Sequence, residues 1–295
     1  MCPAGWKRYS GQNTWDCRAP FGARNDDPHG EPKPVGGSDC KLYQTNAEIQ
    51  GSRLNQKEDK MDLKKVNDTL NTYIRPQTFP IAISLFTAQE ALPAKVKVPV
   101  KDLGYQVALC QAWALSRRYG WTVAVGKEDQ CCIGGHIAMG FMDHPPQGGL
   151  GDDSKNHEPG RYAYMVSAPV DRADFEPDMI CLYVNSAQAM RLAQAAANGG
   201  GGIAPTLATG MGSCGDVVAR TMRTDLNQFI LPSGGNRTFA STQDHELIFT
   251  IPKSKIDTMM KALADTHTAG FRYPVLTDVR HRPNLPPFLE IPKNT

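Results

Sequence analysis

Hydrophobic residues recur with helical spacing in several parts of the chain that follow residue 50. We expect helices over residues 57–74, 105–119 and about 186–197, and a last helix for which Ser254 is the expected N-cap. In the first helix the apolar positions lie three or four residues apart and share one face: Leu63, Val66, Leu70 and Tyr73. The pattern therefore predicts amphipathic helices that cover a core on one side.

Short apolar runs between these helices predict the strands of a sheet. They lie at residues 80–86, 121–125, 162–166, 179–184 and 246–251. The run at 179–184 is continuous rather than alternating, so it is expected to be a central strand that is buried on both faces. The sequence thus predicts an α+β fold with a mixed sheet and flanking helices.

The first 50 residues show neither a helical nor a strand period and are rich in Gly, Pro and Asn. We expect an extended polar N-terminal arm over 1–50, a single α+β core domain over 51–280 and an irregular C-terminal tail over 281–295. An arm without a core of its own has to lie on a globule, either its own or a neighbour's. This organisation favours a homo-oligomer that is held together through the arm.

The charge balance excludes some classes of partner. Lys and Arg number 32 against 30 Asp and Glu, a net charge of +2, so nucleic acid is not an expected partner. No apolar run approaches the roughly 18 residues of a membrane helix, and the N-terminus lacks the apolar segment of a signal peptide. We therefore expect a cytoplasmic protein that does not bind a membrane.

Several separated motifs resemble those of the family known as domain of unknown function 169. They occur in the same order over roughly residues 75–275: Asp174-Phe-Glu-Pro-Asp-Met-Ile, Asn185-Ser-Ala-Gln-Ala-Met-Arg-Leu, Ser213-Cys-Gly-Asp, Phe239-Ala-Ser-Thr-Gln-Asp, Ile251-Pro-Lys-Ser-Lys and Thr266-His-Thr-Ala-Gly-Phe-Arg-Tyr-Pro. Cys132-Ile-Gly-Gly resembles the family's Cys-Pro-Gly-Gly turn, with Ile133 in place of the proline, and Cys110-Gln111 resembles a Cys-Gln pair of the preceding helix. The family is uncharacterised, so the resemblance implies no reaction.

The chain has eight cysteines, which in a reducing compartment serve more often as ligands or catalysts than as cross-links. Cys110 lies within an expected helix, whereas Cys132 and Cys214 lie in glycine-rich turns beside expected helix starts. Glycine lets a backbone approach closely, and a helix N-terminus stabilises a thiolate or an anionic cluster. We predict that Cys110, Cys132 and Cys214 ligate an iron–sulfur cluster of the 4Fe-4S type, with Gly134 and Gly135 beside it.

Three cysteines leave one iron of such a cluster open. A fourth ligand could come from the arm or be a substrate, which would suit a redox or sulfur-linked role, with a redox partner, in an anaerobic or microaerobic cell. Zinc is the alternative metal, with His136 as its nitrogen ligand. Two other functions stay open: a metal-free module that binds a small-molecule ligand, and a thiol-dependent enzyme that uses Cys132 or Cys214 as nucleophile.

A few polar residues outside the cysteine motifs are weaker candidates. His267 lies in the last turn of the final expected helix, where a structural role is favoured over a catalytic one. Arg237 and Arg272 are candidates for binding an anionic ligand, although ordinary surface chemistry is favoured for both. Cys181, inside the expected central strand, is interpreted as a small buried hydrophobic residue.

Overall fold

The computed structural model describes residues 61–142, 157–205 and 212–275, together with Leu285 and Glu290. The chain divides into two units, Met1–Lys57 and Glu58–Thr295, and all described residues belong to the second. The expected arm over 1–50, its role in oligomerisation and most of the expected tail over 281–295 lie outside the described residues.

Six strands form one sheet in the order β2-β3-β1-β4-β6-β5. Their bounds are β1 Ile81–Phe86, β2 Val123–Gly126, β3 Tyr164–Pro169, β4 Met179–Val184, β5 Gln228–Ile230 and β6 Leu247–Pro252. Neighbouring strands pair antiparallel, and among the described residues parallel pairing occurs at isolated bridges such as Lys97 with Val123. The predicted α+β class is confirmed and β4 is a central strand as expected, while the sheet that was expected to be mixed is antiparallel in all its named strand pairs.

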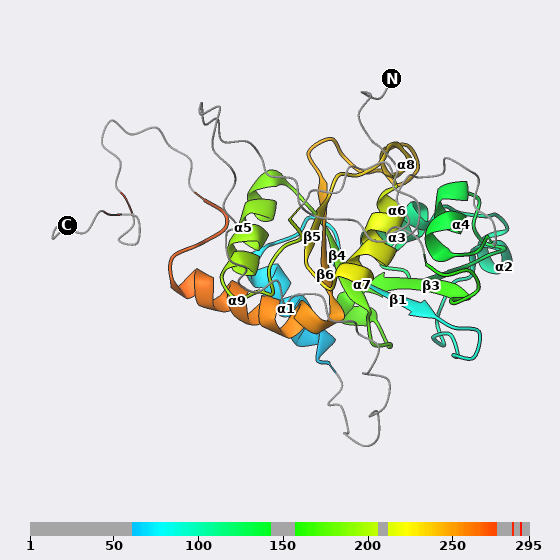
Figure 1. The fold of residues 1–295 in the computed structure, drawn as a ribbon, viewed down its shortest axis with the longest axis horizontal. Coiled ribbons are helices and arrows are strands. Elements are labelled where there is room, and N and C mark those ends of the chain that lie inside the picture. The colour runs from blue at the N-terminus through cyan, green and yellow to red at the C-terminus, as the bar shows by residue number, and fades with distance from the viewer. Residues whose placement is uncertain (1–60, 143–156, 206–211, 276–284, 286–289, 291–295) are drawn as a thin grey trace, which may run out of the picture. The chain divides into compact units, whose positions relative to one another are not determined.

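Helices cover both faces of this sheet (Figure 1). The longer ones are α1 Leu63–Tyr73, α3 Leu109–Tyr119, α5 Ser186–Ala197 and α9 Ile256–Thr268. The shorter ones are α2 Pro99–Leu103, α4 Ile133–Met139, α6 Ser213–Gly215, α7 Thr221–Thr224 and α8 Gly234–Phe239. Within the described residues, no helix is both long and apolar enough to cross a membrane.

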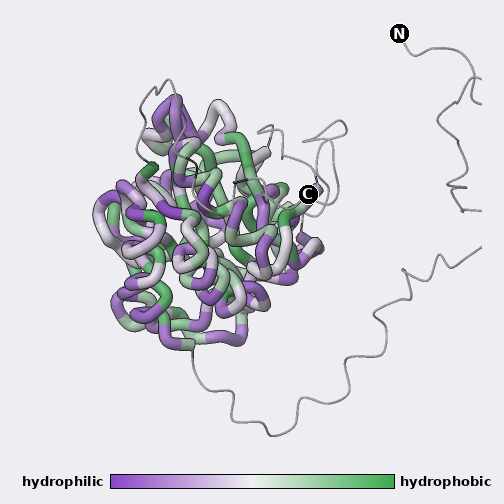
Figure 2. The backbone as a smooth tube through the Cα atoms, turned by 90° about the vertical axis from the view of Figure 1, so that its left-hand side faces the viewer, coloured by the Kyte–Doolittle hydropathy of each residue, from purple (hydrophilic) through white to green (hydrophobic). Residues whose placement is uncertain are grey.

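The two faces of the sheet pack into two separate apolar clusters. Successive residues of β4 alternate between them, so that Cys181 and Tyr183 join α3 and α4, while Leu182 joins α1, α5 and α9. Every residue of β1 and of β4 is buried, as the continuous apolar runs predicted. Figure 2 shows the consequence: hydrophobic segments run through the middle of the molecule and hydrophilic ones lie around them.

One helical stretch changes its geometry part-way along. Residues Asp216–Arg220 form a π-helical turn that joins α6 to α7 without a break. Single π turns inside α-helices are rare and occur frequently at functional sites. Cys214 lies in α6, immediately before this turn.

Three predicted helix starts were wrong. The helix expected from residue 57 begins at Leu63, because Asp62 is its N-cap and accepts a hydrogen bond from the Lys65 N–H. Ser254 lies in a 3₁₀ turn, Lys253–Lys255, and donates a hydrogen bond to Asp225, while Lys255 is the N-cap of α9. The helix expected from residue 105 begins at Leu109, because Val107 is held extended by a parallel bridge to Gln130. For α3 and α9, a tertiary contact that local sequence does not encode precedes the start of the helix.

Candidate cysteine site

Three segments that are distant in sequence bring Cys110, Cys132 and Cys214 to one region of the molecule. Cys110 is in the first turn of α3, Cys132 is the N-cap of α4, and Cys214 is in α6. Helix α4 contacts α6, and all three cysteines pack in or against the apolar cluster between the sheet and α3. They are separated by 22 and 82 residues in the chain, so the tertiary fold alone gathers them.

Cys110 and Cys214 influence each other's ionisation. A hydrogen bond from the Cys214 thiol lowers the pKa of Cys110 against the opposing effect of burial. The same hydrogen bond, followed by burial and by the charges of Cys110 and Cys132, raises the pKa of Cys214 well above its ordinary value. Cys110 is therefore the member of this pair that loses its proton first, while Cys214 keeps its own.

Two other described cysteines differ from these three. Cys181 is fully buried on β4, and burial raises the pKa of its thiol to about 12. It is therefore an inert apolar side chain, which agrees with its interpretation from the sequence. Cys131, next to Cys132 in sequence, is exposed, and burial of its sulfur followed by the charge of Cys132 raises its pKa.

Gln130 organises the turn before α4, and sequence reasoning did not single it out. Its side-chain oxygen accepts a hydrogen bond from the Cys132 backbone N–H at 3.2 Å. Its amide Nε2, in a side chain that is 1% exposed, finds no hydrogen-bond partner among the described residues. A Cβ added to Gly135 would lie 1.8 Å from this Nε2, so the predicted glycine makes room for the Gln130 amide.

Gly134 and His136, also candidates from the sequence, lie on α4. Gly134 is half-buried in the first turn. The Nε2 of His136 lies 2.9 Å from the carbonyl oxygen of Gln130. Because a carbonyl can only accept, Nε2 carries the proton and donates, which leaves Nδ1 as the nitrogen that could bind a metal. In the described ranges, no three His, Cys, Asp or Glu side chains form a ready-made metal site.

A buried polar network lies behind the cysteines. The Ser213 hydroxyl accepts a hydrogen bond from the Asn236 amide at 2.7 Å, and Asn236 accepts one from the Tyr183 hydroxyl at 2.9 Å. The ring of Tyr183 is covered by the guanidinium of Arg117, which pairs with Glu246. This network connects α3, which carries Cys110, with α6, which carries Cys214.

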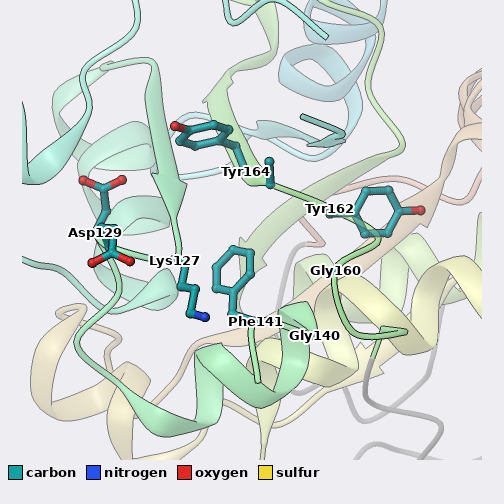
Figure 3. A pocket seen from close by; sticks show the side chains of 9 residues that line it. Lys127, Asp129, Gly140, Phe141, Gly160, Tyr162 and Tyr164 are labelled. Carbon is teal, nitrogen blue, oxygen red and sulfur yellow. The ribbon is translucent and has the colours of Figure 1, made fainter. Parts of the chain in front are cut away.

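A cavity of about 330 Å³ lies at the other end of α4 (Figure 3). It is lined by Lys127, Glu128, Asp129, Gly140, Phe141, Gly160, Tyr162, Ala163 and Tyr164. Figure 3 places the ammonium end of Lys127 beside Phe141. Asp129 is a structural residue here, since its carboxylate accepts from the backbone N–H groups of Val100 and Gly126. None of the cysteines lines this cavity.

Comparison with known proteins agrees with the resemblance seen in the motifs. A family model for domain of unknown function 169 (DUF169), described as an uncharacterised ArCR, matches residues 69–262. The chain belongs to the DUF169 family. The matched range includes Cys110, Cys132 and Cys214, so the candidate site lies inside the DUF169 region and the first 50 residues lie outside it.

One curated relative of this DUF169 protein is the uncharacterized protein MJ0308 of Methanocaldococcus jannaschii. It is 24% identical over 204 residues, which cover 62% of this chain and 85% of the relative. No solved structure matches the chain significantly. The family and this relative are both uncharacterised, so any function has to be argued from the site itself.

Proposed function

We propose that Cys110, Cys132 and Cys214 hold an iron–sulfur cluster of the 4Fe-4S type, and that the protein has a redox or sulfur-linked function in the cytoplasm of an anaerobic or microaerobic cell. The observation that carries the proposal is the convergence of three cysteines from α3, α4 and α6 on one region of an otherwise apolar layer.

The donor groups at the site match a soft, anionic cofactor. Thiolates are the ligands that iron–sulfur clusters take, and N–H donors to the cluster's sulfurs tune its potential. Two buried N–H groups in this layer lack a hydrogen-bond partner among the described residues: Gln130 Nε2 and Trp113 Nε1. Gln130 is bonded to Cys132, and Trp113 follows Cys110 by one turn of α3. Such groups cost about 1–3 kcal/mol each when unpaired, so they favour a bound group that offers acceptor atoms.

A cluster and a zinc ion make different demands on the spacing of the cysteines. Zinc–sulfur bonds are about 2.3 Å long, so zinc needs its ligand sulfurs in mutual contact around one point. No such group of three occurs in the described part of the chain, although Cys110 and Cys214 do contact each other. A cluster keeps its ligand sulfurs farther apart, because iron and sulfide atoms lie between them, so Cys110 and Cys214 would have to separate to hold one. Zinc stays the alternative metal, since His136 donates through Nε2 to Gln130 and keeps Nδ1 as a nitrogen that could ligate it.

A cluster with three cysteine ligands would supply an electron carrier and one iron open to a fourth ligand. The chain itself contributes an apolar wall, two unpaired N–H donors and a rigid support through Tyr183 and Asn236. Exclusion of water by such a wall lowers the local dielectric and so sets the potential of a bound redox centre. A redox partner and a homo-oligomer through residues 1–50 remain predictions, and light scattering of the full chain tests the second.

The test is to purify the full chain without oxygen and to measure iron, acid-labile sulfide and zinc together with an optical spectrum. We expect iron and sulfide in the wild type, and their loss in Cys110→Ser, Cys132→Ser and Cys214→Ser. Cys131→Ser is the matched control, because this exposed neighbour should leave the iron content unchanged. Zinc without sulfide, or a colourless protein with no metal, would overturn the proposal.

Thiol chemistry is the second candidate function, and the ionisation of the cysteine pair favours it. The hydrogen bond from Cys214 lowers the pKa of Cys110, which is how proteins activate a nucleophilic thiol. This shifts the expected nucleophile from Cys132 or Cys214 to Cys110. In metal-free protein we expect iodoacetamide to modify Cys110 much faster than the buried Cys181, as read by peptide mass spectrometry. Equal rates would exclude this candidate.

A further inference from the structure

A guanidinium that has no counter-ion among the described residues is buried on the face of the sheet opposite the cysteines. Arg191 of α5 is 0% exposed and donates one hydrogen bond, from Nη2 to the carbonyl oxygen of Leu263 on α9, at 2.6 Å. Its Nε and Nη1 find no partner in the part of the chain that the structure describes. Among those residues no carboxylate pairs with it either, although Arg is rarely buried without one.

A tyrosine and a histidine lie near Arg191, and a second arginine lies near that histidine. His267 follows Leu263 by one turn of α9, and its ring lies 4.9 Å from the ring of Tyr73. The Nδ1 atom of His267 is buried and has no hydrogen-bond partner among the described residues. Arg272 lies beyond the end of α9 and is exposed. Thus α1, α5 and α9 together present one guanidinium, an imidazole and a phenol, and the segment after α9 adds a second guanidinium.

The pKa shifts of His267 and Arg191 agree with this arrangement of charges. Burial lowers the pKa of His267, and the charges of Arg272 and Arg191 lower it further. Burial also lowers the pKa of Arg191, while Tyr73 acts in the opposite direction. A neutral His267 cannot serve as counter-ion to Arg191.

Such an arrangement is costly without a bound anion. A buried charge whose partner is missing destabilises a protein, because desolvation is not offset by an ion pair. Guanidiniums recognise the oxygens of phosphate and carboxylate groups through several N–H donors held in one plane. Both Arg191 and the His267–Arg272 segment fall in motifs that the sequence analysis noted and that the cysteine site does not use.

We propose that Arg191, His267 and Arg272 form a binding site for the oxyanion group of a small molecule, either a phosphate or a carboxylate. Arg191 supplies the buried charge through Nε and Nη1, and Arg272 supplies the exposed one. Tyr73 forms a wall through its contact with His267. This site lies across the sheet from the cysteines and is independent of whether they hold a metal.

The test is titration of the full-length protein with inorganic phosphate and, separately, with citrate, by calorimetry at constant ionic strength set with sodium chloride. We expect saturable heat with one of the two anions, which distinguishes phosphate from carboxylate recognition. Arg191→Met should weaken that binding at least tenfold, and Arg272→Met should weaken it severalfold. Arg161→Met is the control, since this exposed arginine contacts Tyr162 on the cysteine side of the sheet.

A stability measurement provides an independent test, in case Arg191→Met loses anion binding because its structure is altered. In buffer with chloride only, Arg191→Met should melt at or above the wild-type temperature, because an unpaired buried charge has been removed. The binding anion should raise the melting temperature of the wild type and of Arg161→Met but not that of Arg191→Met. The proposal would be overturned if neither phosphate nor citrate bound, if the anion stabilised all three proteins equally, or if Arg191→Met failed to fold.

Discussion

The guanidinium of Arg117 donates to the carboxylate of Glu246 at 2.8 Å in a place where the two side chains are 0% and 5% exposed. Arg117 also donates to the carbonyl oxygens of Ala240 and Ser241, and its guanidinium lies 3.8 Å from the centre of the Tyr183 ring. The pair joins α3 to the segment that leads into β6, 129 residues later. It thereby fixes the helix on which Cys110 lies.

We predict that Glu246→Gln destabilises the protein by about 3–5 kcal/mol, because it leaves the buried Arg117 without a counter-ion. Urea unfolding followed by circular dichroism measures this loss. The double variant Arg117→Met/Glu246→Leu removes both charges and should regain most of the stability. If the single variant loses less than the double variant, the ion pair is not what stabilises this region.

The acidity of Glu246 adds a pH dependence. Burial alone would raise the pKa of this carboxyl, but the hydrogen bond from Arg117, with that from Gln243, holds it below its usual value. A depressed carboxyl pKa contributes stability that is complete above the unfolded-state value and is lost as the pH falls through the folded-state value. Glu246→Gln should remove this part of the acid sensitivity, as acid titrations monitored by circular dichroism would reveal.

His157 gives a second pH-dependent contribution, at higher pH. Burial, followed by the charges of Arg161 and Arg223, lowers its pKa from 6.5 to about 4. The unfolded chain therefore binds this proton more readily between those values, so stability is complete above pH 6.5 and falls by about 3 kcal/mol toward pH 4. His157→Phe should flatten that part of the curve, and the exposed-histidine variant His245→Asn should not. A curve that His157→Phe leaves unchanged would contradict the assignment.

An element of this fold was predictable from the sequence where neighbouring residues encode it. Helix α5 was predicted almost to the residue because its start is encoded in adjacent residues: Asn185 accepts from the Gln188 N–H, and Gln188 accepts from the Asn185 N–H. Strand β4 was predicted because both of its faces are buried. Strand β5, by contrast, has three residues and among the described strands pairs with β6 alone, and three residues are too few for a periodic pattern.

Gly135→Ala tests the packing of the turn before α4. The new Cβ would lie 1.8 Å from Gln130 Nε2, so the buried amide has to move and its bond to the Cys132 N–H has to break. We expect a loss of about 1–3 kcal/mol in unfolding free energy and faster alkylation of Cys132. Gly234→Ala is the matched control, because nothing lies within 4 Å of its added Cβ and alanine favours the helix. Equal effects of both substitutions would refute this role of Gln130.

Tyr183→Phe tests the connection between the buried network and the cysteine site. Removal of the hydroxyl leaves the Asn236 side-chain oxygen without its buried donor, at a cost of about 1–3 kcal/mol. Because Asn236 also donates to Ser213, next to Cys214, alkylation of Cys214 should become faster in the variant. Hydrogen exchange around α8 and α6 gives an independent measurement. An unchanged alkylation rate at Cys214 would show that the buried network does not influence the cysteine site.

The candidate site was predicted in part. Glycines and helix starts made Cys132 and Cys214 recognisable, because their signals are local. Gln130 and Glu246 could not be recognised, since the role of Gln130 depends on a close contact with Gly135 and that of Glu246 on a partner 129 residues away. The sequence does not indicate that two nitrogens of Arg191 lack partners among the described residues, because this position resembles an ordinary charged residue of an amphipathic helix.

The position of Cys214 relative to Cys110 depends on the number of residues in the π-helical turn Asp216–Arg220. Deleting one residue from this turn would convert it to an ordinary α-helix and rotate Ser213–Gly215 by about 100° about the axis relative to α7. Helix α7 is anchored to the sheet by the hydrogen bond between Thr221 and Thr250, so the rotation would fall on the Cys214 end. The protein would then retain all of its cysteines, but Cys214 would no longer lie beside Cys110. The rotational phase of one helix, and not only the identity of its residues, aligns these two cysteines.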